Sequence, residues 1–162
     1  MEPLIALIVV TLLTFAAGAA GISRLRSWPV ALRGGLAAMF MLTGAVHFFY
    51  MRTDIVQMVP PALPYPDLIV TLTGVLELAG AIGLLWRPVV LWASGGLSLL
   101  LIVMFPANLY VALNGLATHP EDELIPRTLM QLLFLAASLS VWMHYLRRRS
   151  SGADDGLSAR AN

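Results

Sequence analysis

The chain has 162 residues, of which 59% are hydrophobic and only 12% are charged. Soluble domains are about half apolar and about a quarter charged, so this composition indicates a membrane protein. The lack of cysteine excludes disulfides, thiolate metal sites and protein-thiol redox chemistry, and the net charge of +1 disfavours nucleic acid as a partner.

A helix needs about 20 mostly apolar residues to cross a bilayer, and five segments meet this requirement: 3–22, 29–50, 68–86, 89–113 and 128–146. We expect helices, because a backbone exposed to lipid must satisfy its own hydrogen bonds. The predicted fold is therefore all-α, a polytopic bundle with a single integral membrane domain over residues 1–149. A disordered cytoplasmic tail is expected over residues 150–162. Pro106 should kink the fourth helix near its end.

The arginines predict the orientation, because cytoplasmic loops of membrane proteins carry an excess of basic residues. If all five segments span, Arg52 and Arg127 lie at one end with most of the acidic residues. The other end holds Arg24, Arg26, Arg33, Arg87, Arg147, Arg148 and Arg149. We therefore expect the N-terminus outside and the C-terminus in the cytoplasm. An alternative is that residues 3–22 form a cleaved signal peptide, although the start "MEPL" has no basic n-region.

An acidic residue interrupts the third apolar segment. Within "TLTGVLELAGAIGLLW", residues 71–86, Glu77 is the only ionisable residue. It lies about 13 Å along the helix, near the membrane midplane, where an acidic group costs on the order of 3 kcal/mol. We expect Glu77 to face the bundle interior beside small neighbours, which permit close helix packing: Thr73, Gly74, Gly80 and Ala81. Interhelical hydrogen bonding rarely needs so costly a group, so a functional role is the preferred interpretation.

The other core helices also contribute polar residues to the predicted outer half. These are His47 in "LTGAVHFFY", Asn108 in "FPANLY", and Gln131 in "PRTLMQLL", one turn beyond Arg127. Together with Glu77 they predict one shared, outward-opening polar site. The alternative is that Asn108 and Gln131 only hold helices together, at about 1 kcal/mol each, and that His47 is an interfacial histidine. The histidine spacing shows no zinc or haem site.

Four segments carry a resemblance to a known family: "MLTGAVHFFY", "TGVLELAGAIGLL", "FPANLYVAL" and "PRTLMQLLF". In order and spacing they resemble the motifs of DoxX-family integral membrane proteins, over residues 33–142. The resemblance implies a four-helix core, here the second to fifth helices, with residues 3–22 as an addition. It also implies a prokaryotic inner (plasma) membrane location and a family site at His47, Glu77, Asn108, Arg127 and Gln131. Some members are associated with redox systems, including thiosulfate oxidation through quinone and oxidative-stress complexes.

We therefore expect a membrane subunit of a quinone-linked or redox-protective system, in which His47 and Glu77 handle protons or orient a ligand. Quinone is the candidate cofactor, because His47, Gln131 or Asn108 can donate a hydrogen bond to its carbonyl and neutral Glu77 can relay a proton. The expected partners are the lipid bilayer and either a redox subunit or further copies of the chain. Two alternatives stay open: a non-enzymatic scaffold or assembly chaperone, and a transporter or binder of a small lipophilic molecule. Whether the chain is itself catalytic also stays open.

Overall fold

The computed structural model describes residues 1–49, 52–114 and 124–158, and within these ranges its regular structure is entirely helical. The elements in chain order are α1 (Glu2–Ala19), the short 3-10 helix η1 (Ser23–Leu25), α2 (Trp28–Val46), α3 (Arg52–Gln57), α4 (Pro66–Leu85), α5 (Val90–Leu113) and α6 (Leu124–Ser158). Five helices, α1, α2, α4, α5 and α6, are long and apolar enough to cross a membrane. The predicted all-α class and five candidate spans are therefore confirmed.

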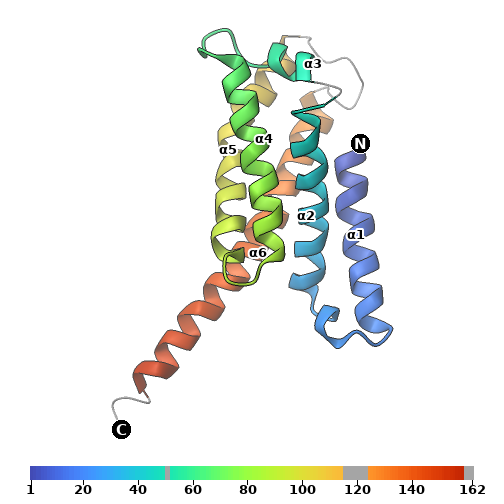
Figure 1. The fold of residues 1–162 in the computed structure, drawn as a ribbon, viewed down its shortest axis with the longest axis vertical. Coiled ribbons are helices and arrows are strands. Elements are labelled where there is room, and N and C mark those ends of the chain that lie inside the picture. The colour runs from blue at the N-terminus through green and yellow to red at the C-terminus, as the bar shows by residue number, and fades with distance from the viewer. Residues whose placement is uncertain (50–51, 115–123, 159–162) are drawn as a thin grey trace.

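The long helices run in alternating directions (Figure 1). Helix α2 packs against α1, α4 and α6, and α5 packs against α4 and α6. The α1–α2 connection, the α4–α5 connection and the far part of α6 lie at the same end of the bundle (Figure 1). The arginine-rich connections are thus at one end, which is the arrangement on which the predicted orientation rests.

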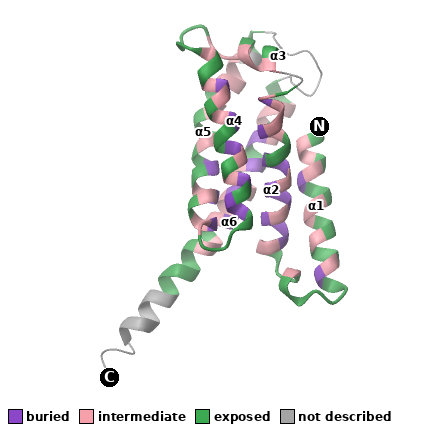
Figure 2. Cartoon of the chain, in the orientation of Figure 1, coloured by how far each residue is buried: buried purple, intermediate pink, exposed green. Residues whose placement is uncertain are grey.

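The core lies where α2, α4, α5 and α6 face one another. Its fully buried side chains include Leu36 and Phe40 of α2, Leu84 of α4, Leu97 of α5 and Val141 of α6. Figure 2 shows buried residues on the inward faces of the helices and exposed residues on the outside. The outer faces carry many large apolar side chains, as a bundle surrounded by lipid requires.

Helix α1 is peripheral and packs mainly on α2. Its contact with α2 is close at Gly35, where an added Cβ would collide with the Thr11 hydroxyl and with the carbonyl oxygen of Leu7. Only two residues of α1, Leu7 and Gly18, are buried. Helix α1 therefore contributes little to the buried core, and the four-helix core implied by the resemblance stays a prediction.

Several helix boundaries differ from the prediction. Helix α2 ends at Val46, before His47, whereas we predicted helix to residue 50. Helix α6 begins at Leu124 and continues to Ser158, whereas we predicted a helix over 128–146 and a disordered tail from residue 150. Loss of hydropathy marks the end of a membrane span and not the end of a helix, and arginine is a good helix former. Residues 159–162 of the predicted tail, and most of the acidic outer loop (115–123), lie outside the described residues.

The proline-rich connection forms no helix between α3 and α4, as the prolines predict. The short helix α3 precedes it and was not predicted. Tyr65, immediately before α4, has a φ of 57°, in the left-handed region. Helix α4 then begins with Pro66 in its first turn, where a missing N–H is tolerated.

Candidate functional site

Glu77 lies inside the bundle, between α4 and α2. Its side chain is only 4% exposed. The hydroxyl of Thr43 on α2 donates a hydrogen bond to Glu77 Oε2, with an Oγ1–Oε2 distance of 2.6 Å. The carboxyl group is therefore held by a donor from the neighbouring helix, as the interior-facing prediction required.

His47 follows the last residue of α2 and is also buried, at 6% exposure. Its Nδ1 lies 2.8 Å from the backbone carbonyl oxygen of Thr43, one turn earlier. Because a carbonyl oxygen only accepts, this hydrogen bond places the proton on Nδ1. In the neutral ring, Nε2 is then the atom that can accept a proton.

Thr43 connects the two ionisable residues. Its hydroxyl binds Glu77 and its carbonyl binds His47, so both groups belong to one site on the α2–α4 side of the bundle. His47 is near enough to Glu77 to interact with it electrostatically. From sequence, their depths differ by about two helical turns. In the structure His47 follows the end of α2, and both His47 and Glu77 form a hydrogen bond with Thr43.

Two glycines permit the close approach of α2 and α4 at this site. An ideal Cβ at Gly44 would lie 3.1 Å from Glu77 Cβ and 2.9 Å from Leu78 Cγ. An ideal Cβ at Gly74 would lie 2.6 Å from His47 Cβ. Larger residues at either position would therefore separate the helices that bring the histidine and the carboxyl group together.

The small residues predicted around Glu77 pack against two different neighbours, the end of α2 and helix α5. Gly74 lies against His47, whereas an ideal Cβ at Gly80 would lie 2.5 Å from Leu97 Cδ2 on α5. Ala81 is completely buried. The small residues thus allow α4 to pack tightly on both α2 and α5.

A second polar group lies between α5 and α6. Asn108 Nδ2 donates to Gln131 Oε1 at 3.0 Å, and Gln131 Nε2 donates to the carbonyl oxygen of Leu101 at 2.7 Å. Arg127 donates to Asn108 Oδ1 from Nη2 at 3.0 Å and from Nε at 3.3 Å. Arg127 Nη2 also lies 3.8 Å from the sulfur of Met58, in the connection after α3.

The hydrogen bonds divide the five expected site residues into two groups. His47 and Glu77 meet at Thr43, whereas Asn108, Arg127 and Gln131 bind one another. Within the described ranges, no hydrogen bond joins the first group to the second. Each group lies between two helices that pack extensively, α2 with α4 and α5 with α6. Polar side chains at similar depth have thus formed hydrogen bonds with the adjacent helix, in two groups. One shared, outward-opening site stays a prediction.

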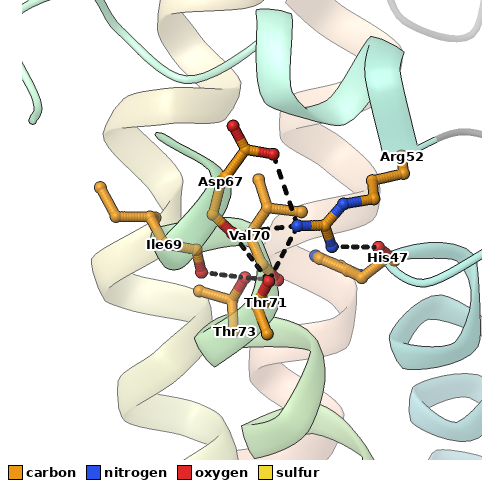
Figure 3. Close-up of polar contacts among 7 residues, drawn as sticks. All are labelled: His47, Arg52, Asp67, Ile69, Val70, Thr71 and Thr73. Atoms are coloured by element: carbon orange, nitrogen blue, oxygen red, sulfur yellow. Dashed lines mark hydrogen bonds and ion pairs between the residues drawn. The ribbon is translucent and has the colours of Figure 1, made fainter. Parts of the chain in front are cut away.

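Arg52 of α3 forms hydrogen bonds with His47 and with the first turns of α4 (Figure 3). Its Nη1 donates to the carbonyl oxygen of His47 at 3.3 Å, and its Nη2 donates to Thr71 Oγ1 at 3.0 Å. Nη2 also forms an ion pair with Asp67 Oδ1 at 3.4 Å. Sequence reasoning placed Arg52 only by its end of the bundle. Its hydrogen bond with Thr71 and its ion pair with Asp67 were not predicted.

The fold and its buried polar groups define the class: an all-helical bundle with five candidate membrane spans and an ionisable pair inside. A family model described as a domain of unknown function (DUF8561) matches residues 36–149, and the chain belongs to this family. No curated protein and no solved structure matches the chain. The matched range begins within α2, so it leaves out α1 and includes both polar groups.

Proposed function

We propose that this chain is a DoxX-like membrane subunit of a quinone-linked redox system, in which Thr43, His47 and Glu77 handle protons for a bound quinone. The observation that carries the proposal is the pairing of a buried carboxyl group and a buried imidazole through one threonine. The pairing supports proton handling, and the resemblance to the DoxX motifs supports quinone as the reacting partner.

Each ionisable group keeps one atom available. The Thr43 hydroxyl donates to Glu77 Oε2, and the Thr43 carbonyl oxygen accepts from His47 Nδ1. Within the described ranges, Glu77 Oε1 and His47 Nε2 accept no hydrogen bond. A carboxyl group and an imidazole that serve only to join helices would be expected to use their full hydrogen-bonding capacity in so apolar a setting. The unused atoms therefore favour a role towards a ligand or a proton.

The chemistry fits the requirements of quinone reduction. A quinone becomes a quinol by taking up two electrons and two protons. In the proposed system, a partner redox subunit supplies the electrons, because no cysteine or metal-ligand spacing in this sequence offers an electron carrier. A carboxyl group can carry one proton, so Glu77 can supply one to the quinone. His47 can donate a proton from Nε2 when the ring is cationic and recover it afterwards.

The experiment compares wild type with Glu77→Gln and His47→Ala. Ser98→Ala is the matched control, because Ser98 is a buried hydroxyl that binds Ser138 between α5 and α6, away from the proposed site. Each protein is purified gently, the retained quinones are measured by mass spectrometry, and quinone-linked oxidation is measured in membranes. We expect the two site variants to lose quinone retention or turnover by at least tenfold and the control to keep both.

Unchanged quinone retention and turnover in both site variants would contradict the proposal. The same samples distinguish the scaffold alternative. A stoichiometric protein partner that stays bound to Glu77→Gln, with no quinone in any sample, would favour an assembly role and leave Glu77 as an interhelical contact. A small lipophilic molecule other than quinone, lost only in the site variants, would favour a binder or transporter.

A further inference from the structure

A cationic cavity lies at the arginine-rich end of the bundle. It has a volume of about 190 Å³, roughly six times the 30 Å³ that one water occupies in the liquid. Its polar lining comes from the α1–α2 connection, the α4–α5 connection and α6: Arg24, Ser27, Arg87, His144, Tyr145 and Arg148.

The charges that the described residues bring to this cavity are of one sign. Arg24, Arg87 and Arg148 come from three separate segments, and none of the described lining residues is acidic. All three arginines are exposed, so a ligand can reach them from the surface. The positive-inside rule accounts for arginines at this end of the bundle. It does not account for their convergence, since exposed arginine side chains are free to extend apart into water.

A buried cation contacts Tyr145, although it does not itself line the cavity. Arg33 is only 8% exposed, and its Nη1 donates to the hydroxyl of Tyr145 at 3.1 Å. Its Nε is buried without a hydrogen-bond partner in the described part of the chain. The guanidinium carbon also lies 6.0 Å from the centroid of the Tyr145 ring. A buried cation without a bonded carboxylate is costly, so an anion in the adjoining cavity would compensate it.

Tyr145 couples Arg33 to the cavity. Its hydroxyl oxygen accepts from Arg33, which leaves the hydroxyl proton available for donation into the cavity that Tyr145 lines. A donor polarised by a cation makes a stronger hydrogen bond to an anion. The cavity thus combines three reachable guanidinium groups with a polarised hydroxyl donor.

We propose that this cavity binds a phosphate group, and that its source is the headgroup of an anionic phospholipid. Basic pockets between membrane helices are suited to such headgroups. The surroundings favour a lipid over a free anion, because an apolar groove of about 320 Å³ lies between α4 and α5 and is lined by Gly83, Val89 and Trp92. Val89 is two residues from Arg87, so the groove supplies apolar surface for an acyl chain at the same end of the bundle.

The test compares two neighbouring arginines on α6, one that lines the cavity and one that does not. Arg148 lines the cavity and Arg147 does not, so Arg148→Gln and Arg147→Gln change the net charge equally. Each full-length protein is placed in nanodiscs that contain phosphatidylcholine with graded phosphatidylglycerol, and the bound lipid is counted by native mass spectrometry. Inorganic phosphate is titrated in a separate arm, with thermal stability as the readout.

We expect wild type and Arg147→Gln to prefer phosphatidylglycerol equally. Arg148→Gln should lose about fivefold in that preference, the factor that corresponds to about 1 kcal/mol for one arginine at a lipid headgroup. Tyr145→Phe, which removes only the hydroxyl, should also weaken the preference.

Equal losses in Arg147→Gln and Arg148→Gln would overturn the proposal, because they would show surface attraction without a site. Stabilisation by inorganic phosphate that is lost in Arg148→Gln, with no preference for phosphatidylglycerol, would overturn the lipid source and support a soluble phosphate ligand.

Discussion

A single added methyl group at Gly74 should disturb the junction of α2 and α4. The ideal Cβ would lie 2.6 Å from His47 Cβ and 2.9 Å from Phe48 Cε2. The His47 Cβ is attached directly to the backbone after α2, so it cannot move aside by a change of rotamer. Gly74→Ala therefore requires α4 and the end of α2 to separate, and we expect lower stability together with a weakened contact between His47 Nδ1 and the Thr43 carbonyl.

The magnitude follows from a comparison with Gly96→Ala. Overpacking a well-packed interior costs about 1–3 kcal/mol, whereas replacing glycine by alanine in a helix contributes up to about 1 kcal/mol of stabilisation. Gly96 is also helical, but its ideal Cβ would have no heavy atom of another segment within 4 Å. The helix-propensity gain is common to both variants and cancels in their difference. Gly74→Ala should thus be less stable than Gly96→Ala by about 1–3 kcal/mol.

The assay is thermal unfolding of both variants and wild type in one detergent. For a chain of this size, 1 kcal/mol corresponds to about 2–4 °C in Tm, so the two variants should differ by about 2–12 °C. Gly96→Ala should unfold at or slightly above the wild-type temperature. Equal Tm values for the two variants, or a more stable Gly74→Ala, would refute the close packing of α4 on His47.

Three further predictions concern the polar contacts. Thr43→Val should lower the unfolding free energy by about 1–3 kcal/mol, because it removes the hydroxyl that donates to Glu77 Oε2. Thr43→Ser keeps a hydroxyl and should retain most of the stability. Equal losses in the two variants would argue against the hydroxyl contact. A double-mutant cycle of Asn108→Ala and Gln131→Ala should give a coupling of about 0.6–1.7 kcal/mol in detergent unfolding, and a coupling near zero would contradict their hydrogen bond. Arg52→Gln should change the unfolding free energy by less than about 1 kcal/mol, because its ion pair is exposed; a much larger loss would mean that its contacts with His47 and α4 dominate.

The membrane spans were predictable because hydropathy reports them directly. Each of the five apolar segments became a long helix. The ends were less predictable, because a helix continues beyond an apolar run wherever the next residues tolerate helical geometry, as α6 does after Leu146. The opposite happens at His47, where α2 ends inside an apolar sequence. Apolar character identifies the segment, whereas local hydrogen bonding determines the terminal residue.

The ionisable members of the site were predictable, but their connection was not. Glu77 and His47 are unusual residues in apolar segments, which identifies them as candidates. Thr43 gives no comparable signal, because a helical threonine commonly bonds a carbonyl of its own helix. Thr11, Thr14 and Thr73 do so here. The Thr43 hydroxyl also lies 3.4 Å from the carbonyl oxygen of Phe40, but its short contact is with Glu77. The i, i+4 spacing of Thr43 and His47 is the one sequence feature that places them on a shared helix face.

The two polar groups differ in how many of their side-chain atoms make a hydrogen bond. In the α5–α6 group, every side-chain oxygen and nitrogen of Asn108 and Gln131 has a hydrogen-bond partner. These contacts join α5 and α6 near Pro106, which cannot donate a backbone hydrogen bond. Each amide nitrogen has a second N–H, so the group can join the two helices and still offer a donor to a ligand.

The α2–α4 group keeps one atom of Glu77 and one of His47 uncommitted while burying both residues. Neither of these two atoms is fully enclosed, because Arg33 Nε is the one fully buried side-chain nitrogen or oxygen without a partner in the described part of the chain. Glu77 Oε1 and His47 Nε2 therefore stay reachable for a proton or a small ligand. Substitutions between α5 and α6, where every amide atom of Asn108 and Gln131 is bonded, should act mainly on stability. Conservative substitutions of Glu77 and His47 should leave the fold intact and act on whatever the pair binds or protonates.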